Sequence, residues 1–454
     1  MEQQDLARGL KNRHVQLIAI GGAIGTGLFL GAGKSIHLAG PSILFAYMIT
    51  GVLLFLVMRA LGELLVSNLE YHSFVDFVQD YLGDRAAFLT GWTYWFCWVS
   101  IAMADLTAVG LYTQFWFPDV AQWVPGLIAL VILLIMNLTT VKLFGEMEFW
   151  FALIKVIAIL ALIVIGIFMI LKGFSTSSGP ASFTNLWSHG GWFPNGMKGF
   201  ILSFQMVVFA FVGIELVGLT AGETADPKNV IPKAINNIPI RIIVFYIGAL
   251  IVIMSIYPWN AIVPTESPFV QVFVAVGIAA AAAIINFVVL TSAASACNSA
   301  VFSTSRMLYG LARDKNAPNS FNKLTKRQVP SNALYFSTII IFISVVLNYV
   351  IPKAEVVFTL VTSVSTVCFL FIWAVTLISH LRYRKTRPEL AAKNTFKMPL
   401  YPVANYIALI FLAFIAVVLA LAEDTRVALF ITPVWFIILL IVYEVRKNKI
   451  VKAN

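Results

Sequence analysis

The sequence predicts an all-α polytopic membrane protein with twelve transmembrane helices. Three observations lead to this fold class: the composition, the number of long apolar segments, and the placement of basic residues. Hydrophobic residues make up 60% of the 454 residues and charged residues only 11%, whereas soluble domains carry roughly 25% charged residues. A single packed core cannot bury so many apolar side chains, so we expect lipid to cover much of the surface.

Twelve segments are apolar over about the 20 residues that a helix needs to cross the hydrocarbon core. The predicted spans are residues 16–36, 41–66, 86–116, 123–141, 149–171, 197–222, 239–258, 270–304, 332–351, 356–381, 400–421 and 428–445. Segments 86–116 and 270–304 exceed a straight span, so we expect tilted helices or helices that continue beyond the hydrocarbon. Residues 1–15 show no cleavage pattern and form a tail, as do residues 446–454.

The basic residues indicate the orientation, because cytoplasmic connections of membrane proteins are rich in Lys and Arg. With the N-terminus inside, most basic residues fall on the inner side. The outer side then holds only Lys34, Lys172, Lys198, Lys353 and Arg426. Both termini are therefore expected in the cytoplasm, and the net charge of +10 reflects topology, not a nucleic-acid partner. Aromatic residues near span ends are typical of interface anchors, here Trp92, Tyr94, Trp95, Trp98, Trp116 and Trp123.

The first span carries a glycine-rich run, GGAIGTG, at residues 21–27. Each glycine inside a helix costs about 1 kcal/mol relative to alanine, so the run predicts an unwinding point. The Thr26 hydroxyl and the freed N–H groups there suit a carboxylate, which also favours the positive end of the following helix. The alternative is a face of small residues, Gly21 and Gly25, against which another helix packs closely.

The sixth span is also interrupted, because Gly213 precedes the ionisable Glu215 at mid-membrane depth. A charged residue there costs about 2.5–3.5 kcal/mol on insertion scales, which indicates a function or a partner for Glu215. The alternative is a protonated Glu215 that is hydrogen-bonded between helices. Freed backbone carbonyls at this break would suit an ammonium group, and the candidates are Phe209, Ala210 and Val212.

The two interrupted spans hold corresponding places in residues 16–172 and 197–381. Paired interruptions of this kind predict an inverted repeat of five plus five spans with a site at the midplane. The two spans within residues 400–445 lie outside the repeat.

Isolated charges in other spans supply further candidates. Lys155 in the fifth span either reaches the cytoplasmic surface, or is a buried amine that exchanges a proton or stands in for a sodium ion. Asp105 in the third span has either a packing role or a coupling role. Arg59 and Glu63, four residues apart, predict an intrahelical ion pair. Small polar residues of the eighth span line a pathway or bond to helix carbonyls: Thr291, Ser292, Ser295, Asn298, Ser299, Ser303, Thr304 and Ser305.

Motifs for enzymatic chemistry are not found. The three cysteines, Cys97, Cys297 and Cys368, lack metal-ligand spacing. A phosphate-binding loop, a GxSxG elbow and an HExxH motif are missing from the sequence. We therefore expect neither an enzyme nor a metal or cofactor.

Several longer runs resemble the bacterial amino acid permeases of the amino acid–polyamine–organocation superfamily. The runs are residues 21–31, 39–49, 58–65, 145–155, 209–224, 225–235 and 303–312. The resemblance implies a leucine-transporter-like fold with the substrate between the broken first and sixth spans. It implies substrate-carboxylate contacts at Ala23, Gly25, Thr26 and Gly27. It implies ammonium contacts at Phe209, Ala210 and Val212.

The same resemblance implies roles for the ionisable residues. Glu215 matches a gating or coupling carboxylate, and Lys155 matches a lysine that replaces a sodium ion in proton-coupled members. Two positions depart from many members: Thr26 stands where they have serine, and Asp105 where aromatic and basic amino acid permeases often have glutamate.

Within the family, residues 90–105, 190–194, 239–259 and 285–308 look most like members that carry D-serine, D-alanine and glycine. The expected function is import of these small zwitterionic amino acids through the bacterial cytoplasmic membrane, by proton symport and without a cofactor. A broader or aromatic L-amino acid permease and an exchanger stay open, as do a sensor or channel on the same frame. The sequence does not determine the oligomeric state.

Overall fold

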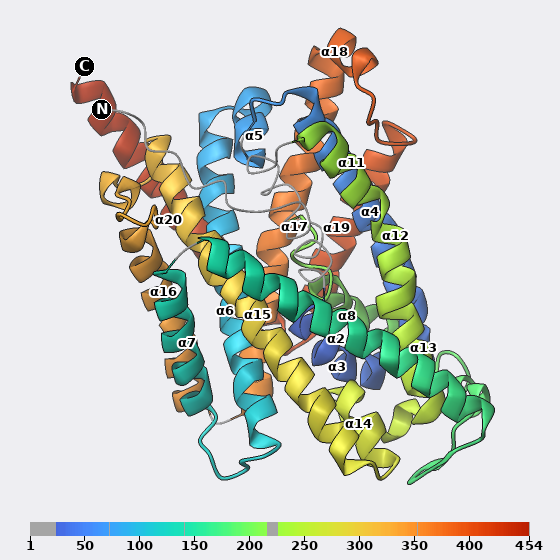
Figure 1. Cartoon of the computed structure of the whole chain (residues 1–454). Coiled ribbons are helices and arrows are strands. Elements are labelled where there is room, and N and C mark those ends of the chain that lie inside the picture. Colours follow the sequence, from blue (N-terminus) through green and yellow to red (C-terminus); the bar gives the residue numbers. More distant parts are fainter. Residues whose placement is uncertain (1–23, 72, 140, 216–225, 352, 454) are drawn as a thin grey trace.

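The computed structural model describes residues 24–71, 73–139, 141–215, 226–351 and 353–453. These residues form an almost entirely helical protein whose long helices run through the molecule between two opposite ends (Figure 1). The α-helices are α2 (Thr26–Phe29), α3 (Gly31–Ala39), α4 (Ile43–Ser67), α5 (Phe74–Leu82), α6 (Asp84–Gln114), α7 (Trp123–Asn137), α8 (Val141–Leu171), α9 (Gly196–Phe209), α11 (Pro227–Asn236), α12 (Ile238–Arg241), α13 (Ala249–Ile256), α14 (Pro268–Ala275), α15 (Ala279–Arg313), α16 (Ser331–Val350), α17 (Ala354–Thr386), α18 (Pro388–Lys393), α19 (Val403–Leu421) and α20 (Arg426–Ala453).

Shorter elements connect these helices. A π-helical segment, η4 (Ile242–Gly248), joins α12 to α13. Short 3-10 helices are η1 (Gly40–Ser42), η2 (Phe183–Leu186), η5 (Trp259–Ala261) and η6 (Asn319–Asn322). The strands β1 (Ser175–Thr176) and β2 (Gly179–Pro180) pair antiparallel in a small hairpin after α8.

The predicted all-α polytopic membrane class is confirmed. Within the described residues, nine helical stretches are long and apolar enough to cross a membrane, and Trp123–Asn137 and Gly196–Phe209 are shorter apolar helices. Span 86–116 is the single long helix α6. The number of twelve spans and the repeat remain predictions.

One predicted span is not a single helix. Residues 270–304 form two helices, α14 and α15, which are separated at Gly277. Gly277 has a φ of +80°, a conformation that glycine adopts readily and that cannot continue a right-handed helix. The chain therefore turns at this point instead of continuing as one tilted helix. At the other end of the chain, α20 extends to Ala453, well past the predicted span end at residue 445.

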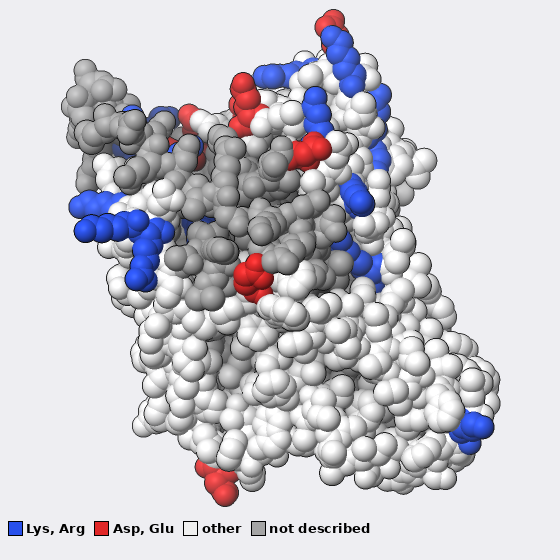
Figure 2. All heavy atoms as spheres, viewed as in Figure 1, with Lys and Arg blue, Asp and Glu red and all other residues white. Residues whose placement is uncertain are grey.

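Charged side chains gather at one end of the molecule. In Figure 2 most visible Lys and Arg side chains lie in the upper half, near α5, α11 and α18 and on the side of α16 and α20. The lower part of this face is almost free of charge down to the opposite end. A positive-inside topology produces an excess of basic residues at one end, and the assignment of this end to the cytoplasm stays a prediction.

The predicted intrahelical pair of Arg59 and Glu63 is wrong. The Arg59 guanidinium donates to the Asn236 side chain instead. Glu63 is fully buried and binds two side chains of α17: its Oε2 lies 2.9 Å from His380 Nε2, and its Oε1 lies 2.6 Å from Arg384 Nε. The four-residue spacing could not predict these partners, because they depend on how α4 packs against α17.

Removing this buried carboxylate is expected to destabilise the protein strongly. Glu63→Ala leaves a buried histidine and an arginine without their anion, which costs about 3–5 kcal/mol of unfolding free energy. The matched control is Glu444→Gln, because the Glu444 pair with Arg85 is exposed and such pairs contribute about 0–1 kcal/mol. Thermal unfolding in detergent measures both variants. Equal Tm values would show that the buried cluster does not stabilise the fold.

Candidate functional site

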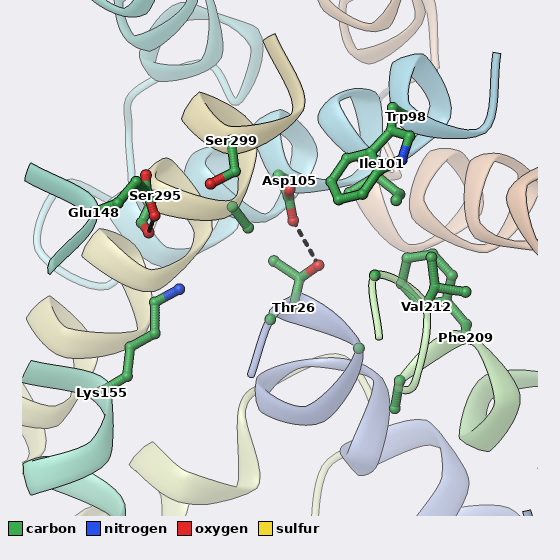
Figure 3. Close-up of a pocket in the computed structure, with 15 residues that line it drawn as sticks. Thr26, Trp98, Ile101, Asp105, Glu148, Lys155, Phe209, Val212, Ser295 and Ser299 are labelled. Atoms are coloured by element: carbon green, nitrogen blue, oxygen red, sulfur yellow. Dashed lines mark hydrogen bonds between the residues drawn. The ribbon is translucent and has the colours of Figure 1, made fainter. Parts of the chain in front are cut away.

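A cavity lies in the middle of the molecule, where α2, α6, α8 and α15 meet the chain that follows α9 (Figure 3). Its volume is about 40 Å³, which is room for about three water-sized groups. The lining residues are Gly25, Thr26, Gly27, Trp98, Ile101, Asp105, Glu148, Lys155, Phe209, Ala210, Val212, Gly213, Ser295, Ala296 and Ser299.

The first wall is the start of α2. Gly25 is extended, with φ −129° and ψ −165°, and the helix begins at Thr26. The Thr26 hydroxyl donates a hydrogen bond of 2.8 Å to Asp105 Oδ1. This hydroxyl therefore connects α2 to α6, and a ligand carboxylate at α2 would meet Asp105 as its neighbour. Ala23 lies outside the described residues.

The second wall is the interruption of the sixth span, which the structure places where the glycine predicted it. Helix α9 ends at Phe209, and turns follow up to Gly213, whose φ is +95°. The Phe209 carbonyl accepts the Val212 N–H at 3.0 Å. The Ala210 carbonyl accepts the Tyr246 hydroxyl at 3.0 Å. These two carbonyls are thus already bonded, and only their second lone pairs remain for an ammonium group.

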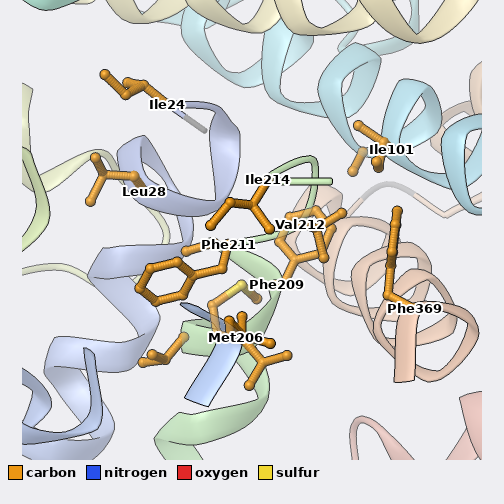
Figure 4. Close-up of a cluster of buried hydrophobic side chains, with 14 of the residues drawn as sticks. Ile24, Leu28, Ile101, Met206, Phe209, Phe211, Val212, Ile214 and Phe369 are labelled. Atoms are coloured by element: carbon orange, nitrogen blue, oxygen red, sulfur yellow. The ribbon is translucent and has the colours of Figure 1, made fainter. Parts of the chain in front are cut away.

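The start of α2 and the interrupted sixth span touch directly at Gly27. A Cβ built on Gly27 would lie 2.6 Å from the Ala210 Cα. Only a residue without a side chain therefore allows this approach. Buried apolar side chains of both segments and of the neighbouring helices form the core in this region (Figure 4): Ile24, Leu28, Ile101, Met206, Phe209, Phe211, Val212, Ile214 and Phe369.

The third wall carries the charged groups. Asp105, Glu148 and Lys155 are only 1%, 4% and 2% exposed, and the Lys155 amine points into the space between the two carboxyl groups (Figure 3). Burial in the cavity excludes the alternative that Lys155 reaches the cytoplasmic surface. Within the described part of the chain, these three are the ionisable residues of the lining.

Glu215 lies apart from this group. It is buried, but it does not line the cavity. Its carboxyl group lies close to Trp373 of α17 and to Tyr94 and Cys97 of α6. The structure therefore brings Asp105 and Lys155 together in the cavity and places Glu215 outside it, near α6 and α17.

Four lining residues were not among the sequence candidates: Trp98, Ile101, Glu148 and Ala296. Trp98, expected as an interface anchor, is 3% exposed and lies in the middle of α6, so this expectation is wrong. Glu148 and Ile101 were not singled out. Glu148 precedes Lys155 by seven residues, which places both on one helix face, and this spacing is a signal that the sequence contains.

Nearly the whole chain is similar to known proteins. The family model described as amino acid permease matches residues 14–453. Two relatives come from Bacillus subtilis: the uncharacterized transporter YdgF, 78% identical over 99% of this chain and 98% of its own length, and the amino-acid permease AapA, 73% identical over 99% and 96%. The D-serine/D-alanine/glycine transporter of Escherichia coli K12 is 59% identical over 96% and 93%.

Proposed function

The chain belongs to the amino acid permease family, and on that premise we propose that it imports D-serine, D-alanine and glycine by proton symport. The observation that carries the proposal is the cavity itself. Backbone groups at the start of α2 and in the interrupted sixth span meet there beside one buried lysine and two buried carboxyl groups. The substrates named for the Escherichia coli relative support the same choice.

The shape of the cavity supports a small substrate. Trp98 and Ile101 face Phe209 and Val212 across it (Figure 3). An α-carboxylate would bind at Gly25, Thr26 and Gly27, and an α-ammonium at the carbonyls of the interrupted sixth span. Recognition then depends on groups common to all amino acids, and the walls exclude long side chains.

The proposed architecture has twelve spans, with a first repeat at residues 16–172, a second at 197–381 and two further helices at 400–445. Both termini would lie in the cytoplasm of a bacterial cell, and the proton gradient would drive uptake. Lys155, Asp105 and Glu215 would couple proton movement to transport, with Glu215 acting as a gate.

Uptake into proteoliposomes tests this function. Labelled D-serine, D-alanine and glycine are offered with and without an inward proton gradient. We expect accumulation with the gradient, mutual competition among the three substrates, and collapse on addition of a protonophore. Uptake that needs internal amino acid and ignores the gradient would identify an exchanger. Exclusion of the D-enantiomers would leave an amino acid permease of other specificity.

Trp98→Ala is expected to widen the substrate range. Removing this wall relieves a steric penalty of roughly 1–3 kcal/mol for a larger side chain, which is about 10–200-fold. The ratio of leucine to glycine uptake should therefore rise by about tenfold or more. The control is Trp150→Ala on α8, because Trp150 is exposed and should leave the ratio unchanged. An unchanged ratio in Trp98→Ala, with normal glycine uptake, would show that Trp98 does not limit the site.

A further inference from the structure

We propose that Glu148 is the permanent counter-ion of Lys155, and that this pairing leaves Asp105 as the group that exchanges the driving proton. The inference rests on the proposed function and assigns a role to a residue outside the family's expected site. It is carried by the placement of Glu148, by its hydrogen bonds and by the charge balance of the cavity.

Glu148 and Lys155 share one face of α8. Seven residues make almost two full helical turns, so both side chains project to the same side. Both line the cavity and are nearly fully buried. A buried ammonium group needs an anion close by, and Glu148 is the carboxylate that its own helix provides.

Hydrogen bonds from α15 hold the Glu148 carboxylate in place. Ser295 donates to Oε2 at 2.9 Å, and the Asn298 amide donates to Oε1 at 3.1 Å. The Asn137 amide in turn donates to Asn298 Oδ1 at 2.9 Å and orients it. Both carboxylate oxygens thus accept donors, an arrangement that stabilises the ionised form.

Asp105 has a different environment. Its Oδ1 accepts the Thr26 hydroxyl, and its Oδ2 accepts no hydrogen bond from the described residues. From the packed helices, Lys155 of α8 and Cys297 of α15 face it, with Tyr112 on its own helix. Oδ2 is therefore the carboxylate oxygen in the cavity that can take a proton without losing a donor.

The charge balance of the cavity indicates which carboxyl group binds the driving proton. One lysine and two carboxylates leave one negative charge in excess, and an uncompensated buried charge is unfavourable. A proton from the outer water on Asp105 Oδ2 removes the excess, and it leaves to the inner water when the substrate is released. Because the substrate is a zwitterion, each cycle moves one positive charge inward.

The test compares Glu148→Gln and Glu148→Asp with the wild type in proteoliposomes, with Glu146→Gln as the control carboxylate outside the cavity lining. In Glu148→Gln, Lys155 pairs with Asp105 and keeps it ionised. Gradient-driven glycine accumulation should fall by about 30-fold or more and lose its dependence on external pH. Counterflow of labelled glycine against internal glycine should persist. Glu148→Asp should recover part of the gradient-driven accumulation, and Glu146→Gln should match the wild type.

Two results would overturn the inference. The first is wild-type accumulation of glycine in Glu148→Gln, which would exclude a role of Glu148 in coupling. The second is a joint loss of counterflow and accumulation in Glu148→Gln without recovery in Glu148→Asp, which would indicate a structural role. If the wild type itself shows no gradient-driven uptake, the proposed function fails, and the wild-type arm reveals this separately.

Discussion

Lys155→Ala is expected to lower gradient-driven accumulation of glycine by about 100-fold or more, since removing one member of a buried charged group costs about 3–5 kcal/mol. Lys155 lies in the cavity with Asp105 and Glu148, and its charge compensates one of these carboxylates. Without it, both acids are left without a cation, and a proton taken up would stay bound. Accumulation of labelled glycine in proteoliposomes with an inward proton gradient measures the effect.

The matched control is Lys172→Ala, which removes an exposed lysine just beyond the end of the same helix. It should transport like the wild type. A second variant tests the proposed gate: Glu215→Ala should also abolish accumulation of glycine. Full accumulation in both Lys155→Ala and Glu215→Ala would show that the coupling roles are wrong.

Gly27→Ala is expected to damage both the site and the stability of the protein. The new Cβ would lie 2.6 Å from the Ala210 Cα and 3.0 Å from the Ala210 N. These are backbone atoms that cannot rotate away, so α2 and the interrupted sixth span must separate. Overpacking of this kind costs roughly 1–3 kcal/mol, and we expect a lower Tm in detergent together with a loss of glycine uptake.

Gly25→Ala is the matched comparison, two residues earlier on the same segment. Among the described residues, no atom lies within 4 Å of a Cβ built there, and the extended backbone of Gly25 suits alanine. Its Tm should stay close to that of the wild type. An equal loss of Tm in both variants would mean that the segment requires glycine for its backbone conformation, not for the close approach to Ala210.

The sequence alone determined where the chain is apolar and where the sixth span breaks, but it did not predict the break at Gly277. Span length follows from the thickness of the hydrocarbon, which is the same for every helix, so a local count of apolar residues suffices. Gly213 marks a real interruption because its positive φ is a local property. Thr26, Asp105 and Lys155 were found because a polar or charged group within an apolar span needs a function or a partner.

Only the tertiary structure decided which of these groups face one another. Trp98 lines the cavity, and Glu63 binds a histidine 317 residues away. Glu215 lies outside the cavity, near α6 and α17. The tertiary structure also placed Ser295 and Asn298 of α15 against the Glu148 carboxylate. Such contacts depend on the rotation and crossing of whole helices, which many weak packing contacts determine together. Polar and charged candidates within apolar spans can therefore be read from the sequence, but their pairing depends on how the helices pack.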